Sequence, residues 1–209
     1  FMLPRPPRST LSPPTTLFRS RYSRGGRANA DRILFNPNNV NFATGAIVNE
    51  GLAVDFVKQA EAGVKYRAGG LALYATAFYA ETEETNFEAT TLRSFDRVFK
   101  AKGLELEASY RTGGFTFSAG GTYTDAEISR DRITPANQGN TPRRQADFIY
   151  QLSGQYEQDM FTLGANMVGT TDSFAQDDNQ LVLPGFAQVN AFVAVRPFDR
   201  VQLSVNANN

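Results

Sequence analysis

Hydrophobic and polar residues alternate along most of this chain, and the alternating runs are joined in pairs by short turns. Tyr-Arg-Ala-Gly-Gly at 66–70 recurs as Tyr-Arg-Thr-Gly-Gly at 110–114, and short turns occupy the same place at 156–160 and 195–200. The runs on either side are about 9 to 13 residues long, close to the roughly 9–11 residues that a tilted strand needs to cross a bilayer. The pattern therefore predicts antiparallel transmembrane β-strands.

Short turns and long polar loops alternate between the predicted strands. The strands are predicted at residues 57–66, 71–80, 98–110, 115–126, 145–156, 161–172, 186–195 and 201 onward, with the end of an earlier strand at 21–26. Loops are predicted at 28–55, 81–97, 127–144 and 173–185. Bacterial outer-membrane barrels have short periplasmic turns and longer external loops. We therefore predict an all-β fold: a fragment of an antiparallel transmembrane β-barrel, in which about eight or nine meandering strands form an open curved sheet or half-barrel.

The first 20 residues differ from all that follow. Residues 1–20 are rich in Pro, Ser, Thr and Arg, lack a useful periodicity and resemble a translated sequencing adapter. We expect this segment to be irregular, either foreign to the protein or a disordered Pro-rich linker, and residues 21–209 to form the partial barrel. Because the chain starts at Phe1 and stops at Asn209 within a strand pattern, we also expect both ends to be truncations.

The predicted strands have one apolar and one polar face, except the strand at 71–80, which is apolar on both faces. The polar face cannot point at lipid, because an Arg or Lys there costs roughly 2–4 kcal/mol at the bilayer midplane. We therefore predict that it lines a wet or plugged lumen. The lumen-facing candidates are Glu61, Glu105, Glu107, Asp147 and Asn190.

Aromatic residues flank the short turns. Tyr66, Tyr110 and Tyr156 each end a strand, and Phe115 and Phe161 each begin the next one. Aromatic rings favour the membrane interface, where the ring lies in hydrocarbon and a Tyr hydroxyl reaches the head groups. We predict that these five residues form an aromatic girdle at the periplasmic membrane interface.

The composition restricts the available chemistry. The chain has no Cys and no His, which removes disulfides, thiol catalysis, imidazole bases and most transition-metal sites. Its formal net charge is zero, which argues against a nucleic-acid partner. Glu105 and Glu107 share a face, but no other feature supports acid–base catalysis by them. We therefore predict no enzymatic activity, no cofactor and no bound metal.

Five short strings resemble, in order, the C-terminal barrel of TonB-dependent outer-membrane receptors. They are Glu-Ala-Gly-Val-Lys at 61–65, Lys-Gly-Leu-Glu-Leu-Glu-Ala at 102–108, Thr-Pro-Arg-Arg at 141–144, Leu-Pro-Gly-Phe at 183–186 and Val-Asn-Ala-Asn-Asn at 205–209. Each string is short, but all five occur in the family's order with the matching alternation of loops. The resemblance covers roughly residues 21–209.

The resemblance implies a barrel of about 22 strands with a plugged lumen, of which this chain holds eight or nine. It implies contact with lipid in the outer membrane of a Gram-negative bacterium. It also implies energised import of a scarce small molecule, such as an iron–siderophore complex or another metal chelate, driven by TonB acting on a plug domain. The 209 residues depart from the family pattern in showing no plug, no TonB-contacting segment and no final strand ending in an aromatic residue.

Plainer roles are open to the charged residues. The lumen carboxylates are more simply explained by solvation and by cross-strand pairing with Lys65, Arg67 and Lys102. Three loop carboxylates could bind Ca²⁺ through oxygen ligands, although they more simply keep the loop soluble: Asp172, Asp177 and Asp178. Four loop cations could attract an anionic chelate or lipopolysaccharide phosphates, or simply be charged loop residues: Arg130, Arg132, Arg143 and Arg144.

Two further classes of protein are compatible with parts of the pattern. A membrane-embedded barrel enzyme is disfavoured by the lack of His, but a passive porin would share the polar lumen. A soluble β-repeat protein is suggested by the spacing from Tyr66 to Tyr110 and on to Tyr156, which is near propeller blade periods of about 40–45 residues. A blade has four short strands, however, whereas each repeat here has two long ones.

Overall fold

The fold is almost entirely β-structure. The computed structural model describes residues 15–28, 40–41, 46–47, 54–88, 93–132, 134–198 and 200–209. Within these ranges the regular elements are strands and one short 3₁₀ turn, η2 (Pro135–Asn137). No helix in the described part of the chain is long and apolar enough to cross a membrane.

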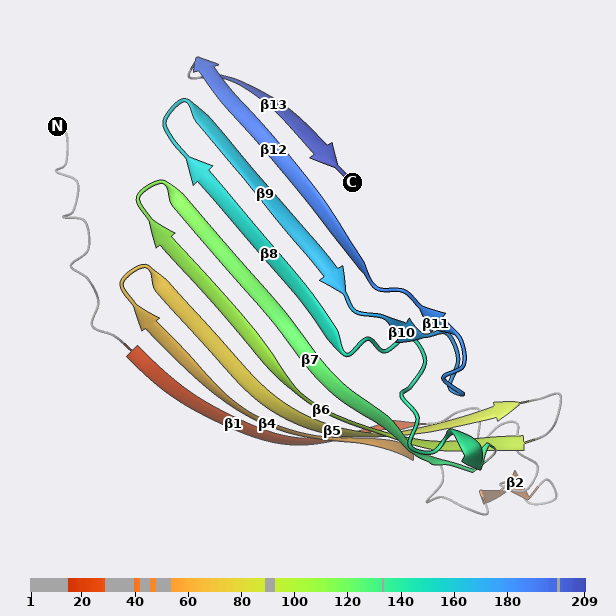
Figure 1. Cartoon of the computed structure of the whole chain (residues 1–209). Coiled ribbons are helices and arrows are strands. Elements are labelled where there is room, and N and C mark those ends of the chain that lie inside the picture. The colour runs from red at the N-terminus through yellow and green to blue at the C-terminus, as the bar shows by residue number, and fades with distance from the viewer. Residues whose placement is uncertain are drawn as a thin grey trace.

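Nine strands form one open sheet with the order β1-β4-β5-β6-β7-β8-β9-β12-β13, and each pairs antiparallel with its neighbours (Figure 1). The strands are β1 (Thr15–Ala28), β4 (Val54–Ala68), β5 (Leu71–Glu88), β6 (Arg93–Thr112), β7 (Phe115–Asp131), β8 (Phe148–Glu157), β9 (Phe161–Thr170), β12 (Phe186–Phe198) and β13 (Val201–Asn208). Two small ladders lie outside the sheet: β2 (Val40–Asn41) with β3 (Ala46–Ile47), and β10 (Ser173–Phe174) with β11 (Val182–Leu183). The predicted all-β meander is confirmed.

The two kinds of connection lie at opposite ends of the sheet. Figure 1 shows the turns β4–β5, β6–β7, β8–β9 and β12–β13 at one end and the long connections at the other. Gly69 and Gly113 have φ angles of 55° and 54°, in the left-handed region that favours glycine. A tight hairpin needs such a residue, so the repeated glycine pairs explain why the strands reverse where they do.

The register places apolar residues on one face of the sheet and polar residues on the other. Directly opposed residues point to the same face. One row across the sheet reads Ser109, Ser118, Ser153, Asn166, Asn190 and Asn208, and these residues lie on what we call the polar face. A row on the opposite, apolar face reads Tyr66, Leu73, Ala108, Ala119, Leu152, Met167 and Val189.

The sheet is a single layer with almost no buried core. Among the described residues the buried apolar side chains are Val98, Ile128, Ala146 and Ala194. Large side chains on the apolar face are open, as with Leu106 at 50% and Leu203 at 64% exposure. A protein in water rarely leaves an apolar surface of this extent uncovered. The face therefore requires an apolar surrounding.

The continuous sheet contradicts the soluble β-repeat alternative. A propeller divides its strands into separate four-stranded blades. Here nine strands are hydrogen-bonded into one sheet in chain order, with no crossover.

Several predicted loops are partly strands. Strand β5 continues to Glu88 and β6 begins at Arg93, so most of the predicted loop at 81–97 is a paired extension of the β5–β6 hairpin. Strand β7 likewise continues to Asp131, and β8 starts at Phe148 instead of residue 145. Apolar alternation fades in these segments, but the backbone ladder does not depend on it. The prediction of loops there was wrong for this reason.

The boundary predicted at residue 20 was also wrong. Strand β1 begins at Thr15 and pairs with β4 in continuous register, from Thr15 opposite Arg67 to Ala28 opposite Val54. Residues 15–20 are therefore regular strand, although their Ser, Thr and Arg content hides the alternation. Residues 1–14 lie outside the described residues, and so does most of the predicted loop at 28–55.

Candidate functional site

The polar face carries a cluster of charged side chains over strands β1 to β6. Glu61 forms ion pairs with two arginines of β1, at 3.8 Å from Arg19 Nη2 and 3.9 Å from Arg21 Nε. A recess of about 410 Å³ opens beside this cluster, and its lining includes Arg19, Glu61, Lys65, Tyr74, Glu105 and Glu107. The sheet thus concentrates ionisable groups from four strands on one wall.

Tyr74 separates the cations of β4 from the carboxylates of β6. It lies directly opposite Lys65 on one side and Glu107 on the other. The Lys65 ammonium lies 5.2 Å from the centre of the Tyr74 ring, and Arg67 Nε donates a 2.9 Å hydrogen bond to the Tyr74 hydroxyl. The cations therefore contact an aromatic ring, and the predicted pairing of Lys65 and Arg67 with the lumen carboxylates was wrong.

Lys102 was also assigned to the wrong partner. It lies directly opposite Tyr79 and Asp125, in a row of the apolar face. Its ammonium is 3.1 Å from Asp125 Oδ2. A lysine on that face cannot reach Glu105 or Glu107, whose side chains leave the sheet on the other side.

The five lumen-facing candidates all occupy positions on the polar face. Glu61, Glu105 and Glu107 lie on neighbouring strands near the recess. Asn190 lies across the sheet and donates a 3.0 Å hydrogen bond to Asn166 Oδ1. Asp147 is exposed just before β8, where its carbonyl accepts a hydrogen bond from Thr124 N–H. The register thus groups three of the candidates and leaves two apart, and their role in a lumen stays a prediction.

The predicted girdle residues lie on the apolar face beside the short turns. Rings of Phe115 and Tyr156 have centroids 4.4 Å apart, and those of Tyr156 and Phe161 are 5.8 Å apart. Tyr110 lies directly opposite Phe117, and Tyr66 opposite Leu73. Three of the five rings therefore form a continuous row. That this row lies at a membrane interface remains a prediction.

A second aromatic row lies nearer the long connections, and the sequence reasoning missed it. Tyr79 and Tyr123 are 43% and 52% exposed on the apolar face, and Tyr123 lies directly opposite Phe148. Phe115 and Tyr123 are eight residues apart on β7, and Tyr156 and Phe148 are eight apart on β8. This constant spacing is a signal that the sequence contained.

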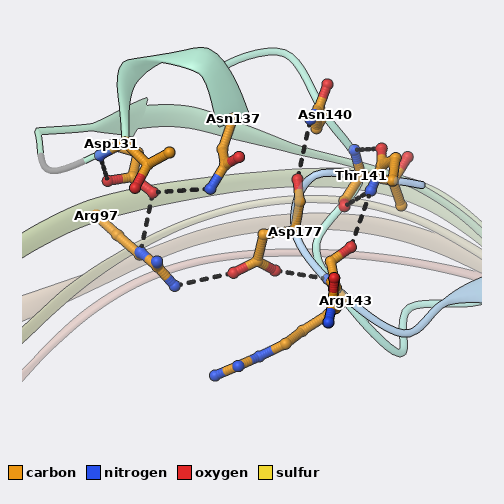
Figure 2. Close-up of polar contacts among 10 residues, drawn as sticks. Arg97, Asp131, Asn137, Asn140, Thr141, Arg143 and Asp177 are labelled. Carbon is orange, nitrogen blue, oxygen red and sulfur yellow. Dashed lines mark hydrogen bonds and ion pairs between the residues drawn. The ribbon is translucent and has the colours of Figure 1, made fainter. Parts of the chain in front are cut away.

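Polar contacts join two long connections to Arg97 of β6, at the end of the sheet that carries the long connections (Figure 2). Arg97 of β6 lies between two carboxylates: its Nε is 3.1 Å from Asp131 Oδ2, and its Nη1 is 2.9 Å from Asp177 Oδ2. The Asp131 side chain is only 1% exposed, and its Oδ1 accepts a 2.9 Å hydrogen bond from Thr134 N–H. Arg97 of β6 lies directly opposite Asp131, the last residue of β7.

Asp177 also anchors the connection that follows β7. Its Oδ1 accepts a 2.9 Å hydrogen bond from Arg143 N–H, and its carbonyl accepts one from the Asn140 side chain. Thr141 and Asn179 exchange two further bonds of 2.9 and 2.8 Å. We call this set the loop clasp: Arg97, Asp131, Asn140, Thr141, Arg143, Asp177 and Asn179.

The loop clasp gives Asp177 a role that the sequence did not indicate. Both of its carboxylate oxygens have partners, Arg97 and the Arg143 backbone, so the structure gives it a role in holding the connections together in place of the Ca²⁺ site considered above. In the described part of the chain no group of three acidic residues is placed to hold a metal ion. Arg97 and Asp177 are 80 residues apart, and no local pattern links them.

Comparison with solved structures identifies the same fold. The siderophore receptor PiuA from Acinetobacter baumannii matches 95% of this chain with a TM-score of 0.75 and 19% sequence identity. BauA, the ferric preacinetobactin receptor of the same organism, matches 92% with a TM-score of 0.71 and 16% identity. FyuA, the ferric yersiniabactin uptake receptor from Yersinia pestis, matches 93% with a TM-score of 0.70 and 18% identity.

These neighbours are much longer than this chain. The matched part is 30% of PiuA and 29% each of BauA and FyuA. No curated protein sequence matches the chain. A family model described as "TonB dependent receptor-like, beta-barrel" matches residues 8–209. Because that match spans nearly the whole sequence, the chain belongs to the TonB-dependent receptor β-barrel family.

Proposed function

We propose that this chain is part of the barrel of an outer-membrane TonB-dependent receptor that imports a scarce ligand such as an iron–siderophore complex. The observation that carries the proposal is the division of one nine-stranded sheet into an apolar and a polar face, in a chain of this family. In a Gram-negative outer membrane the apolar face contacts lipid and the polar face lines the lumen. TonB acts on the receptor through a plug domain outside these 209 residues.

The ligand class is supported by the neighbours. PiuA, BauA and FyuA are described as a siderophore receptor, a ferric preacinetobactin receptor and a ferric yersiniabactin uptake receptor. In this role the barrel surrounds and guides the ligand. A role in transport without catalysis agrees with a family of transport receptors.

Uptake of radioactive iron tests the proposal directly. Cells producing the full-length receptor are supplied with a panel of ferric siderophores, in the presence and absence of TonB. We expect uptake of at least one complex that requires both the receptor and TonB. Uptake that persists without TonB would favour a passive pore, and no uptake of any complex would remove iron chelates as the ligand class.

We expect replacement of Glu105 and Glu107 by Gln to lower uptake. Within the described residues neither carboxylate forms an ion pair with another residue of the sheet, and both line the polar recess. Both are therefore available to a cationic group of the plug or to the ligand. Loss of one hydrogen bond to a charged group costs roughly 1.5–3 kcal/mol, so we expect uptake to fall by about tenfold or more.

The control for this prediction is Asp159→Asn in the exposed β8–β9 turn. It removes one carboxylate charge far along the chain from the recess and should leave uptake unchanged. Receptor levels in the outer membrane are compared by immunoblot. Equal uptake by the Glu105/Glu107 variant and the wild type would show that these carboxylates serve only to hydrate the wall.

A further inference from the structure

The apolar face changes abruptly into a charged face at the end of the sheet that carries the long connections. The row Ala62, Ala77, Leu104, Tyr123 and Phe148 is uncharged. The next row contains Tyr79, Lys102 and Asp125, and the row after that contains Lys58, Glu81, Lys100 and Glu127. All of these side chains leave the same side of the sheet, because directly opposed residues share a face. We call the six charged residues the charged belt.

The belt residues are engaged with one another. Lys58 Nζ donates a 2.8 Å hydrogen bond to Glu81 Oε1, and Lys102 Nζ is 3.1 Å from Asp125 Oδ2. The side chains of Lys102 and Asp125 are 69% and 51% exposed. Cations and carboxylates alternate from Lys58 to Glu127, and Arg24 of β1 lies directly opposite Lys58 at the end of that row, so the belt is strongly polar and its charges nearly balance.

We infer that the charged belt contacts the polar head-group layer of the membrane, and that the hydrocarbon core ends between the Leu104 row and the Lys102 row. This inference rests on the proposed function, which places the apolar face in lipid. Charged residues on the lipid-facing side of a barrel are tolerated only near the interfaces. A surface of alternating charge complements a head-group layer, which contains phosphate and its balancing cationic groups.

The distance to the opposite girdle supports this boundary. Eight residues separate Phe115 from Tyr123 and Tyr156 from Phe148. At about 3.3 Å per residue this is about 26 Å along the strand, and a tilt of roughly 40° reduces it to about 20 Å across the membrane. Half a row of residues beyond the aromatic rings at each boundary adds one row in total. The apolar span across the membrane then comes close to the roughly 25 Å apolar band of such barrels.

Lys58 and Glu81 of the belt stabilise each other in the charged form. The hydrogen bond from Lys58 lowers the pKa of the Glu81 carboxyl below its ordinary value. The same bond raises the pKa of Lys58 above its ordinary value. Both side chains are therefore charged at neutral pH.

Strand β5 continues beyond the belt to Glu88, and strand β6 begins at Arg93. The end of this hairpin therefore projects past the head groups.

Spin-label accessibility tests the boundary. Single cysteines are placed at Leu104, Lys100 and Glu105 of the full-length receptor, in which any other cysteine is replaced by Ser. The receptor is reconstituted in phosphatidylethanolamine–phosphatidylglycerol vesicles, and collisions of the label with oxygen and with a water-soluble nickel chelate are measured. We expect the ratio of oxygen collisions to nickel collisions to be several-fold higher at Leu104 than at Lys100. The label at Glu105 is at nearly the same depth in the membrane as Leu104 but points to the lumen.

The outcomes separate this inference from the proposed function. A Lys100 label as accessible to oxygen as the Leu104 label would overturn the boundary while leaving the lipid-facing side intact. A Leu104 label as accessible to nickel as the Glu105 label would instead contradict the membrane position of the apolar face. Labels at Ala77 and Glu81, in the same two rows on β5, repeat the comparison if a label on β6 prevents folding, which is checked by heat-modifiable gel mobility.

Discussion

Replacement of Val189 by Arg is expected to block assembly of the receptor, whereas Asn190→Arg on the same strand should be tolerated. Val189 lies on the apolar face, opposite Met167, and is 46% exposed. Its row continues through Leu152 to Ala119, midway between Phe115 and Tyr123 on β7, so an Arg there faces hydrocarbon and costs roughly 2–4 kcal/mol near the midplane. Asn190 lies on the polar face beside Asn166 and Asn208, where an Arg side chain reaches water.

The assay is the fraction of full-length receptor that becomes heat-modifiable and protease-resistant in the outer membrane. Both variants add the same side chain to β12 at adjacent positions, so strand propensity and expression are matched. We expect little folded Val189→Arg receptor and nearly wild-type amounts of Asn190→Arg. Equal assembly of the two variants would contradict the assignment of the two faces and, with it, the position of the apolar face in lipid.

Replacement of Asp177 by Ala is expected to release the connection between β7 and β8. The Asp177 carboxylate joins Arg97 of β6 to the backbone of Arg143. The variant therefore loses both of these contacts at once. A hydrogen bond to a charged group contributes roughly 1.5–3 kcal/mol, so the open population should rise by about 10- to 100-fold. Proteolysis follows that population when opening and closing are fast.

Trypsin provides the readout, because Arg143 and Arg144 lie in the released connection and are both exposed. We expect cleavage there to accelerate in the purified Asp177→Ala receptor while the strands stay intact. Asp178→Ala is the matched control, since Asp178 accepts local hydrogen bonds from Gln180. Similar cleavage rates in the two variants would mean that the clasp does not hold the connection in place.

The strand extensions show where the alternation of apolar and polar residues no longer predicts the secondary structure. The alternation at 98–110 and 115–126 predicted β6 and β7 because one side of each strand must be apolar in lipid. Beyond the charged belt this alternation ends, because Glu83 and Glu84 are both polar and Val98 and Phe99 are both apolar, although Glu84 still pairs with Arg97. A loop and a solvated strand have similar compositions. The register of the ladder distinguishes them, and it is a property of two strands together.

For the candidate site, too, the sequence predicted the positions of some side chains but not their partners. The faces of Glu61, Glu105, Glu107 and Asn190 followed from counting along their own strands. The partners of Lys65, Arg67 and Lys102 did not, because charge complementarity suggests pairs without stating which side chains lie within reach. Tyr74 lies between Lys65 and Glu107, and Lys102 lies on the other face, which only the pairing of β4, β5 and β6 reveals.

The sequence by itself determined the strands, the short turns and the two faces, because all three depend on neighbouring residues. Period-2 alternation is set by the geometry of one strand, and glycines at a tight turn are set by the backbone angles of that turn. The tertiary structure decided three further features: the extension of the β5–β6 hairpin, the alignment of the aromatic residues of neighbouring strands into a second row, and the loop clasp. These depend on residues far apart in the chain, such as Arg97 and Asp177 at a separation of 80 residues, which meet only when the intervening strands pair.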